Sequence, residues 1–224
     1  MTFSIVARSA DGTSFGVAIA SSSPAVAARC AHARARAGAV ASQNITDPAL
    51  GQRLLESLAH GVPTEQALRD TVASTLHASF RQLLAVGPSG PPRIHSGAKA
   101  LGVVGEAIGV DAASAGNLLA SPDVPQAMVQ AFGSAEGALA ERLLTALRAG
   151  LVAGGEAGPI HSAGLLVVRD VSWPIVDLRV DWHESDPIGA LEEAWQIYKP
   201  QVEDYVRRAL DPAAAPSFGV PGDL

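Results

Sequence analysis

The chain has 224 residues, 48% of them hydrophobic, which predicts one domain with a sizeable buried core. Its formal net charge of −6, without a long run of like charges, argues against nucleic acid or an anionic membrane surface as a partner. The single cysteine, Cys30, excludes an intrachain disulfide and a cysteine-based metal site, and is typical of a reducing compartment.

The start of the chain predicts a β-hairpin. Residues 2–8 alternate in a β-rich pattern, residues 9–13 supply turn chemistry, and residues 15–20 form a second apolar run. Alternate side chains of a strand share one face, so we expect Thr2 and Ser4 to lie side by side.

The next segments predict a strand, two helices and further strands. A strand over residues 37–43 ends in Gln43-Asn44, and Asp47-Pro48 then begins a helix that runs to about His60. A second helix begins near Thr64 and extends toward Leu76. Strands follow at residues 80–86, 93–96 and 106–111, the last leading into 115–119.

The second half predicts a helix pair over residues 121–132 and 135–149, strands over residues 162–169 and 175–181, and a long helix from Asp186-Pro187. We expect residues 1–210 to form a single domain. Residues 211–224 are rich in Pro, Ala and Gly and are expected to be a loosely ordered tail.

Strands and helices are grouped rather than alternating as in βαβ units. This order predicts an α+β fold, with two sheets covered by helices in a four-layer αββα sandwich. The alternative is a two-layer α+β domain.

Thr2 is the leading candidate for chemistry. Methionine aminopeptidase generally removes Met before a small residue, so the mature chain could begin with Thr2. Thr2 would then carry a hydroxyl nucleophile and a free α-amine that titrates near neutral pH and can take the hydroxyl proton. The alternative is that Thr2 only begins a strand.

Segments spread over most of the chain resemble one known family. They are residues 2–8 (TFSIVAR), 16–21 (GVAIAS), 38–43 (GAVASQ), 116–119 (GNLL), 162–168 (SAGLLVV) and 177–181 (DLRVD). They resemble the bacterial and archaeal domain of unknown function 1028 family, which is assigned to the N-terminal nucleophile (Ntn) hydrolase superfamily. The resemblance implies the αββα fold, a hydrolase site at the start of the first strand, and Thr2 as nucleophile. The opening hairpin also resembles that of proteasome-type subunits.

Two features depart from the superfamily pattern. The second strand leads to Ser21-Ser22-Ser23 where a lysine is expected, and Met1 stands before Thr2 in place of a propeptide. A retained Met1 would turn the α-amine of Thr2 into an amide and remove the base.

Polar residues at the predicted strand ends are candidates for the rest of the site. Ser4 and Asn117 join Thr2 as catalytic candidates, and the amides of Asn117 and Gln43 could donate to an oxyanion. Their alternative role is to bond nearby backbone. The candidates for substrate binding are Ser21, Ser22, Gln43, Asn44, Glu156, Asp177 and Arg179. For Asp177 and Arg179 a structural ion pair is the favoured interpretation.

Other ligands have little support in the sequence. The histidines show no metal-type spacing and no glycine-rich stretch has a phosphate-loop setting, so we expect neither a metal nor a cofactor. The basic cluster Arg29, His32, Arg34 and Arg36 could bind an anionic group of a substrate, although a solvated face is favoured.

We find no signal-peptide pattern and no apolar run near the roughly 20 residues of a membrane span, so a soluble cytoplasmic protein is expected. A homo-oligomer, a dimer or larger, is a further expectation. The sequence favours a hydrolase that cleaves a C–N bond, such as an amide or cyclic amide, of a small metabolite through an N-terminal threonine. The alternative is a lapsed hydrolase scaffold that binds a small molecule or serves in assembly.

Overall fold

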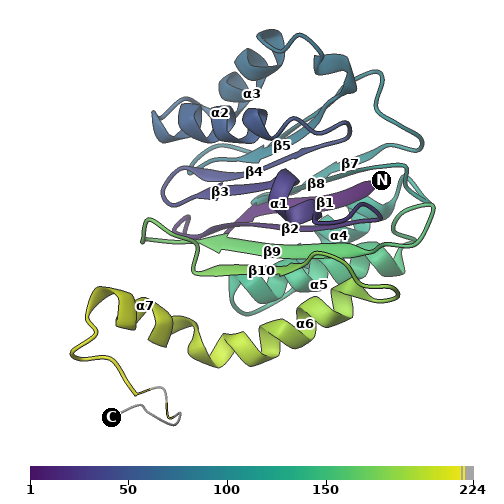
Figure 1. Cartoon of the computed structure of the whole chain (residues 1–224). Coiled ribbons are helices and arrows are strands. Elements are labelled where there is room, and N and C mark those ends of the chain that lie inside the picture. Colours follow the sequence, from purple (N-terminus) through teal and green to yellow (C-terminus); the bar gives the residue numbers. More distant parts are fainter. Residues whose placement is uncertain (218, 220–224) are drawn as a thin grey trace.

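The computed structural model describes residues 1–217 and 219, and its strands form two antiparallel sheets (Figure 1). The six-stranded sheet has the order β10-β9-β2-β1-β8-β7 and the four-stranded sheet the order β3-β4-β5-β6. The strands are β1 (Thr2–Arg8), β2 (Phe15–Ser21), β3 (Ala31–Arg34), β4 (Gly38–Gln43), β5 (Gln82–Val86), β6 (Arg93–Ser96), β7 (Gly105–Ile108), β8 (Ala112–Asn117), β9 (Ser162–Val168) and β10 (Val176–Val180). The expectation of a mixed fold with two sheets is thereby confirmed.

Most of the helices pack against one sheet on the side away from the other sheet, whereas the short helix α1 contacts strands of both sheets (Figure 1). The helices are α1 (Val26–Cys30), α2 (Pro48–Ala59), α3 (Thr64–Ala73), α4 (Val124–Ser134), α5 (Leu139–Val152), α6 (Pro187–Tyr198) and α7 (Val202–Leu210). Helices α2 and α3 contact the four-stranded sheet, and α4, α5 and α6 contact the six-stranded sheet. None of the helices in the described part of the chain is long and apolar enough to cross a membrane.

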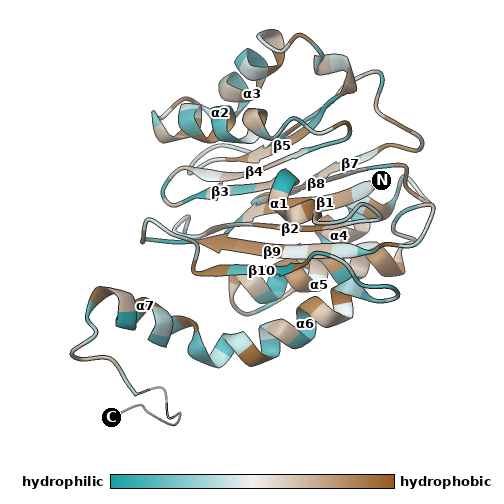
Figure 2. Ribbon diagram, in the orientation of Figure 1, coloured by the Kyte–Doolittle hydropathy of each residue, from teal (hydrophilic) through white to brown (hydrophobic). Residues whose placement is uncertain are grey.

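The alternation along β1 decides which side chains enter which layer. Phe3 and Ile5 lie in a core cluster with Met128 of α4 and Leu143 of α5, whereas Val6 lies in a second cluster between the sheets. Thr2 and Ser4 therefore share the face of β1 that points toward the four-stranded sheet, as predicted. In Figure 2, β9 is largely hydrophobic while the helices carry both hydrophilic and hydrophobic residues.

The predicted helix starts at Asp47-Pro48 and Asp186-Pro187 are confirmed. The Asp47 carboxylate accepts a hydrogen bond from the amide of Ala49 at 3.1 Å, and that of Asp186 accepts one from the amide of Gly189 at 2.8 Å. In both helices proline takes the first position, where no amide donor is needed.

Several segments differ from the sequence predictions, among them residues 106–111, where β7 ends at Ile108 and β8 begins only at Ala112. Helix α1 and strand β3 were not predicted. Groups distant in the sequence fix the start of α1: the amide of Ala25 donates to the carbonyl of Asp181 and that of Val26 to the Ser162 hydroxyl. Helix α3 ends at Ala73, and Leu76 is 90% exposed, so the expected extension toward Leu76 is wrong.

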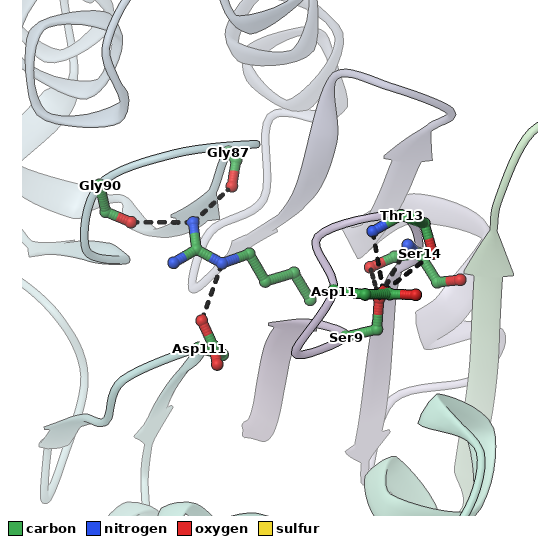
Figure 3. A network of polar contacts seen from close by, with 8 residues as sticks. Ser9, Asp11, Thr13, Ser14, Gly87, Gly90 and Asp111 are labelled. Atoms are coloured by element: carbon green, nitrogen blue, oxygen red, sulfur yellow. Dashed lines mark hydrogen bonds and ion pairs between the residues drawn. The ribbon is translucent and has the colours of Figure 1, made fainter.

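An arginine joins loops of both sheets at the end of β1 opposite to Thr2. Arg8 donates from Nε to the Asp111 carboxylate at 2.8 Å and from Nη1 to the carbonyls of Gly87 and Gly90 at 3.0 and 2.9 Å (Figure 3). In the adjacent hairpin turn, the Asp11 carboxylate accepts hydrogen bonds from Ser9 and Thr13. This end of the sheet pair is therefore held together by polar contacts.

The tail that was predicted from residue 211 follows directly after α7. In its described part, the carbonyls of Pro216 and Ser217 each accept a hydrogen bond from Arg208 of α7 at 3.2 Å. Residues 218 and 220–224 of that prediction lie outside the described residues.

Candidate functional site

A cavity of about 380 Å³ opens beside the start of β1. Because β1 runs antiparallel to β2 and β8, its first residue lies next to the last residues of those strands, and Thr2 is paired with Asn117 in the sheet. The lining combines small polar groups with a few apolar ones: Met1, Thr2, Ser21, Ser23, Val26, Arg29, Cys30, Asn44, Ile45, Thr46, Pro48, Leu101 and Asn117. Four sequence candidates, Thr2, Ser21, Asn44 and Asn117, thus meet at one cavity.

Two hydroxyl groups lie side by side at the cavity. The Oγ1 of Thr2 is 3.3 Å from the Oγ of Ser21, and both hydroxyls donate to the carbonyl oxygen of Met1. Thr2 is 7% exposed and Ser21 is fully buried, so the Met1 carbonyl is their main acceptor here. Removal of Met1 would free both hydroxyls and create an amine on Thr2 itself.

Glu156 lies behind the end of β2. Its two carboxylate oxygens accept hydrogen bonds from the amide of Ser22 at 3.1 and 3.0 Å, and its backbone pairs with Leu119 beyond β8. Burial raises the pKa of Glu156 to about 7, although the α-ammonium group, the Ser22 bonds and His161 oppose the shift. This carboxyl group can therefore hold or release a proton near neutral pH.

Glu156→Gln is expected to remove a pH dependence of stability. The unfolded chain loses the Glu156 proton near its ordinary pKa of 4.5 and the folded chain near 7, so stability falls as pH rises between these values. The difference corresponds to about 3 kcal/mol. Urea unfolding of parent and variant at a series of pH values from 4 to 8 measures this contribution, as the change with pH in the difference between their free energies of unfolding.

The exposed Glu106 provides the control, since Glu106→Gln should leave the parent's pH profile unchanged. If the free energies of unfolding of the parent and of Glu156→Gln differed by a constant amount from pH 4 to pH 8, the raised pKa of Glu156 would be contradicted.

A chain of buried amides connects the two sheets behind the cavity. Ser4 donates to the Gln43 carbonyl oxygen at 2.7 Å, and the Gln43 amide donates to Gln82 at 2.8 Å and to the carbonyl of Ala115 at 3.2 Å. Asn117 donates to the same Gln82 oxygen at 3.0 Å. Gln82 is thus the centre of the network.

Gln82 was missed in the sequence. Its amide nitrogen donates to Ser96 at 2.8 Å and to the carbonyl of Gly116 at 3.1 Å, so both ends of the side chain are bonded. A polar residue at the start of an apolar strand was its only local signal. Its importance follows from the pairing of Gln43 with Gln82 across β4 and β5, which the sequence does not display.

The loop after β4 shapes one wall of the cavity. The Asn44 amide donates to the carbonyl of Phe80 at 2.5 Å, and its side-chain oxygen accepts from the amide of Leu101 at 3.1 Å. Asn44 and Ile45 both have positive φ, 55° and 47°. That conformation is uncommon outside glycine and especially for a β-branched residue, and such residues cluster at ligand sites.

Several candidates do not line the cavity. Asp177 and Arg179 pair with each other on β10, with Nε and Nη2 at 2.7 and 2.8 Å from the carboxylate oxygens, so they form the ion pair that was favoured. Ser4 and Gln43 are fully buried in the amide network, and Ser22 contributes its backbone amide to Glu156.

Metal and thiol chemistry find little support at the site. The described residues contain no group of three His, Cys, Asp or Glu side chains that could hold a metal ion. Cys30 is buried with its Sγ 3.4 Å from the Thr46 hydroxyl, and burial raises the pKa of its thiol. A raised pKa disfavours the thiolate, which is the reactive form.

Comparison with known proteins gives a clear family match. A family model described as "Family of unknown function (DUF1028)" matches residues 2–191. The crystal structure of protein SPO2555 from Silicibacter pomeroyi, a DUF1028 protein, is 30% identical with a TM-score of 0.84 over 92% of this chain and 94% of that chain. Anbu (ancestral beta-subunit) from Yersinia bercovieri is 12% identical with a TM-score of 0.40 over 92% and 97% of the two chains, too low to support an argument. No curated protein matches.

Proposed function

The chain belongs to the family of unknown function DUF1028, and we propose that it is a hydrolase that cleaves a C–N bond of a small molecule with Thr2 as its N-terminal nucleophile. In this proposal, the helices and the two facing sheets form the four-layer αββα sandwich of Ntn hydrolases. The observation that carries the proposal is the meeting of Thr2, Ser21 and Asn117 at one cavity, at the start of β1.

The chemistry begins once Met1 is removed. The α-amine of Thr2 takes the proton of the Thr2 hydroxyl, directly or through one water, and Oγ1 attacks the substrate carbonyl. When the C–N bond breaks, the protonated amine gives its proton to the leaving nitrogen. Water then hydrolyses the ester on Thr2 by the same route and restores the free hydroxyl.

Asn117 is the best donor for the developing oxyanion. One N–H of its side-chain amide is bonded to Gln82, which holds the amide in place at the cavity wall. The other has no partner among the described residues and remains for a ligand. Gln43, the other amide candidate, has its nitrogen and its oxygen engaged in the network. We therefore place Gln43 and Ser4 in support of Asn117 rather than in contact with substrate.

Ser21 and Glu156 complete the proposed site. The Ser21 hydroxyl lies 3.3 Å from Thr2 Oγ1, where it can orient the nucleophile in place of the lysine of related hydrolases. Glu156 is close enough to the chain start for the α-ammonium charge to lower its pKa. That charge belongs to Met1 in this structure. In the proposal, the amine that removal of Met1 leaves on Thr2 takes its place, and the Glu156 carboxylate orients this amine as the base.

A second candidate function is a lapsed site that binds a small molecule without cleaving it. It is favoured by the bonds of both hydroxyls to the Met1 carbonyl, which satisfy the Thr2 and Ser21 side chains when Met1 is present. In that form the Thr2 nitrogen is an amide and cannot act as a base.

Intact mass and an amide panel, measured on one preparation, together separate the two candidates. The untagged protein is expected to be lighter than its full sequence by one methionine residue, because Thr2 is small and Met1 precedes it. The same preparation should hydrolyse at least one member of a panel of linear and cyclic amides. Thr2→Ala also loses Met1, since Ala is small, and so serves as the control that keeps the amine and lacks the hydroxyl. Complete retention of Met1 in a preparation that still hydrolyses amides would refute the N-terminal mechanism.

A further inference from the structure

One charged side chain stands out at the cavity. Among the residues that line it, Arg29 is the only one with a charged side chain, and the other polar side chains carry neutral hydroxyl, amide or thiol groups. The basic cluster seen in the sequence is divided in the fold: Arg34 and Arg36 are exposed away from the cavity, and His32 is buried against Gly51. Arg29 is thus the member of the cluster that faces the proposed site.

The backbone around α1 holds Arg29 by one nitrogen. Its Nη1 donates to the carbonyl of Pro24 at 2.6 Å and to that of Ala25 at 3.2 Å. Within the described part of the chain, its Nε and Nη2 form no hydrogen bond and no carboxylate pairs with it. The guanidinium therefore keeps one complete edge, with two parallel N–H groups, for a ligand.

The same edge binds carboxylates elsewhere in this protein. Arg148 contacts the two oxygens of Glu192 through Nε and Nη2 at 3.1 and 2.6 Å. Arg179 contacts Asp177 in the same way. A guanidinium edge and a carboxylate match in spacing and charge, and the bonds are strengthened because both partners are ionised.

We propose that the Nε–Nη2 edge of Arg29 binds a carboxylate of the substrate, so that the site takes small amide-bearing carboxylic acids, either N-acyl amino acids or cyclic amides with an acid group. The bond that is hydrolysed rests on the proposed function, whereas the binding of the carboxylate does not. A single guanidinium edge balances one negative charge, which fits a carboxylate better than a doubly charged phosphate.

The remaining lining fits the rest of such a molecule. Val26, Ile45 and Leu101 offer apolar surface for an acyl group or ring, and Thr46 and Asn44 offer polar groups. A cavity of about 380 Å³ is in the range of small-molecule sites and leaves little room for a protein chain.

Titration calorimetry with the full-length Thr2→Ala protein tests the proposal without turnover. The probes are N-acetylglycine, N-benzoylglycine and pyroglutamate, each compared with its neutral carboxamide. We expect at least one acid to bind about tenfold or more tightly than its carboxamide, and Arg29→Gln to abolish that preference. Arg29→Lys keeps the positive charge but loses the two parallel N–H groups, so it should retain only part of the preference for the acid over its carboxamide. Arg34→Gln is the exposed control and should bind as the parent does.

A panel in which no acid binds more tightly than its carboxamide overturns the proposal, as does a preference that survives in Arg29→Gln. Thermal unfolding of each variant shows whether it is folded, and the comparison of acid with carboxamide in the parent needs no Arg29 variant. Carboxylate binding that depends on Arg29 without any hydrolysis by the mature protein would refute the proposed function alone. Equal hydrolysis of acids and carboxamides would refute the role of Arg29 alone.

Discussion

Replacing Thr2 with Ala is expected to lower the rate of C–N bond hydrolysis at least about 10³-fold, because the variant keeps the α-amine and lacks the attacking oxygen. The loss should appear in kcat, with substrate binding little changed, since Oγ1 contacts only Ser21 and the Met1 carbonyl in the described structure. Steady-state kinetics on the first substrate found in the amide panel, with binding measured separately, provides the test.

Thr2→Ser is the matched control for this experiment. It keeps a hydroxyl, allows removal of Met1, and is expected to retain most of the activity. The lost hydrogen bond in Thr2→Ala should cost about 1 kcal/mol of folding stability, so unfolding does not explain a large loss of rate. If Thr2→Ala turned over substrate as fast as the parent, Thr2 would not be the nucleophile.

Gln82→Leu is expected to destabilise the protein by about 3 kcal/mol or more. The substitution keeps most of the side-chain volume and removes the partner of four groups: the Gln43 and Asn117 amides, the Ser96 hydroxyl and the Gly116 carbonyl. Gln82 is fully buried, so water cannot replace the lost bonds without a rearrangement of the sheets. Urea unfolding of parent and variant measures the loss.

Gln126→Leu, an exposed substitution on α4 with the same change of chemistry, should stay within about 0.5 kcal/mol of the parent. The double variant Gln43→Leu with Gln82→Leu should lose less than the sum of the two single losses, because both remove the same bond. A loss below about 1 kcal/mol for Gln82→Leu would mean that the network does not hold the two sheets in register.

The sequence predicted what depends on neighbours along the chain. Alternation in the first eight residues placed Thr2 and Ser4 on one face of β1, and Asp47-Pro48 marked the start of α2, because strand and helix-capping patterns are local. Helix α1 was not predicted because the groups that fix its start, Asp181 and Ser162, come from the other end of the chain. Gln82, the centre of the amide network, was not predicted either, because its partners Gln43 and Asn117 lie on strands that are distant from it in the sequence.

Among the site residues, those at strand ends were easier to predict than their partners. Thr2, Ser21 and Asn117 meet because antiparallel pairing brings the start of β1 to the ends of β2 and β8, which a predicted hairpin already suggests in part. Arg29 appeared in the sequence only as one of four basic residues. Its distinction from Arg34 and Arg36 depends on the turn before α1, where Ala25 has a φ of 51°.

The bonds from Thr2 and Ser21 to the Met1 carbonyl have a practical consequence for anyone who expresses this protein. A purification tag or fusion partner attached before Met1 would keep that carbonyl on Thr2. Under the proposed mechanism, such a preparation would hydrolyse none of the compounds tested. The opposite end is the safer place for a tag, because α7 lies far from the N-terminus (Figure 1). The position of a handful of vector-encoded residues would then decide whether a substrate screen finds an enzyme or an inert protein.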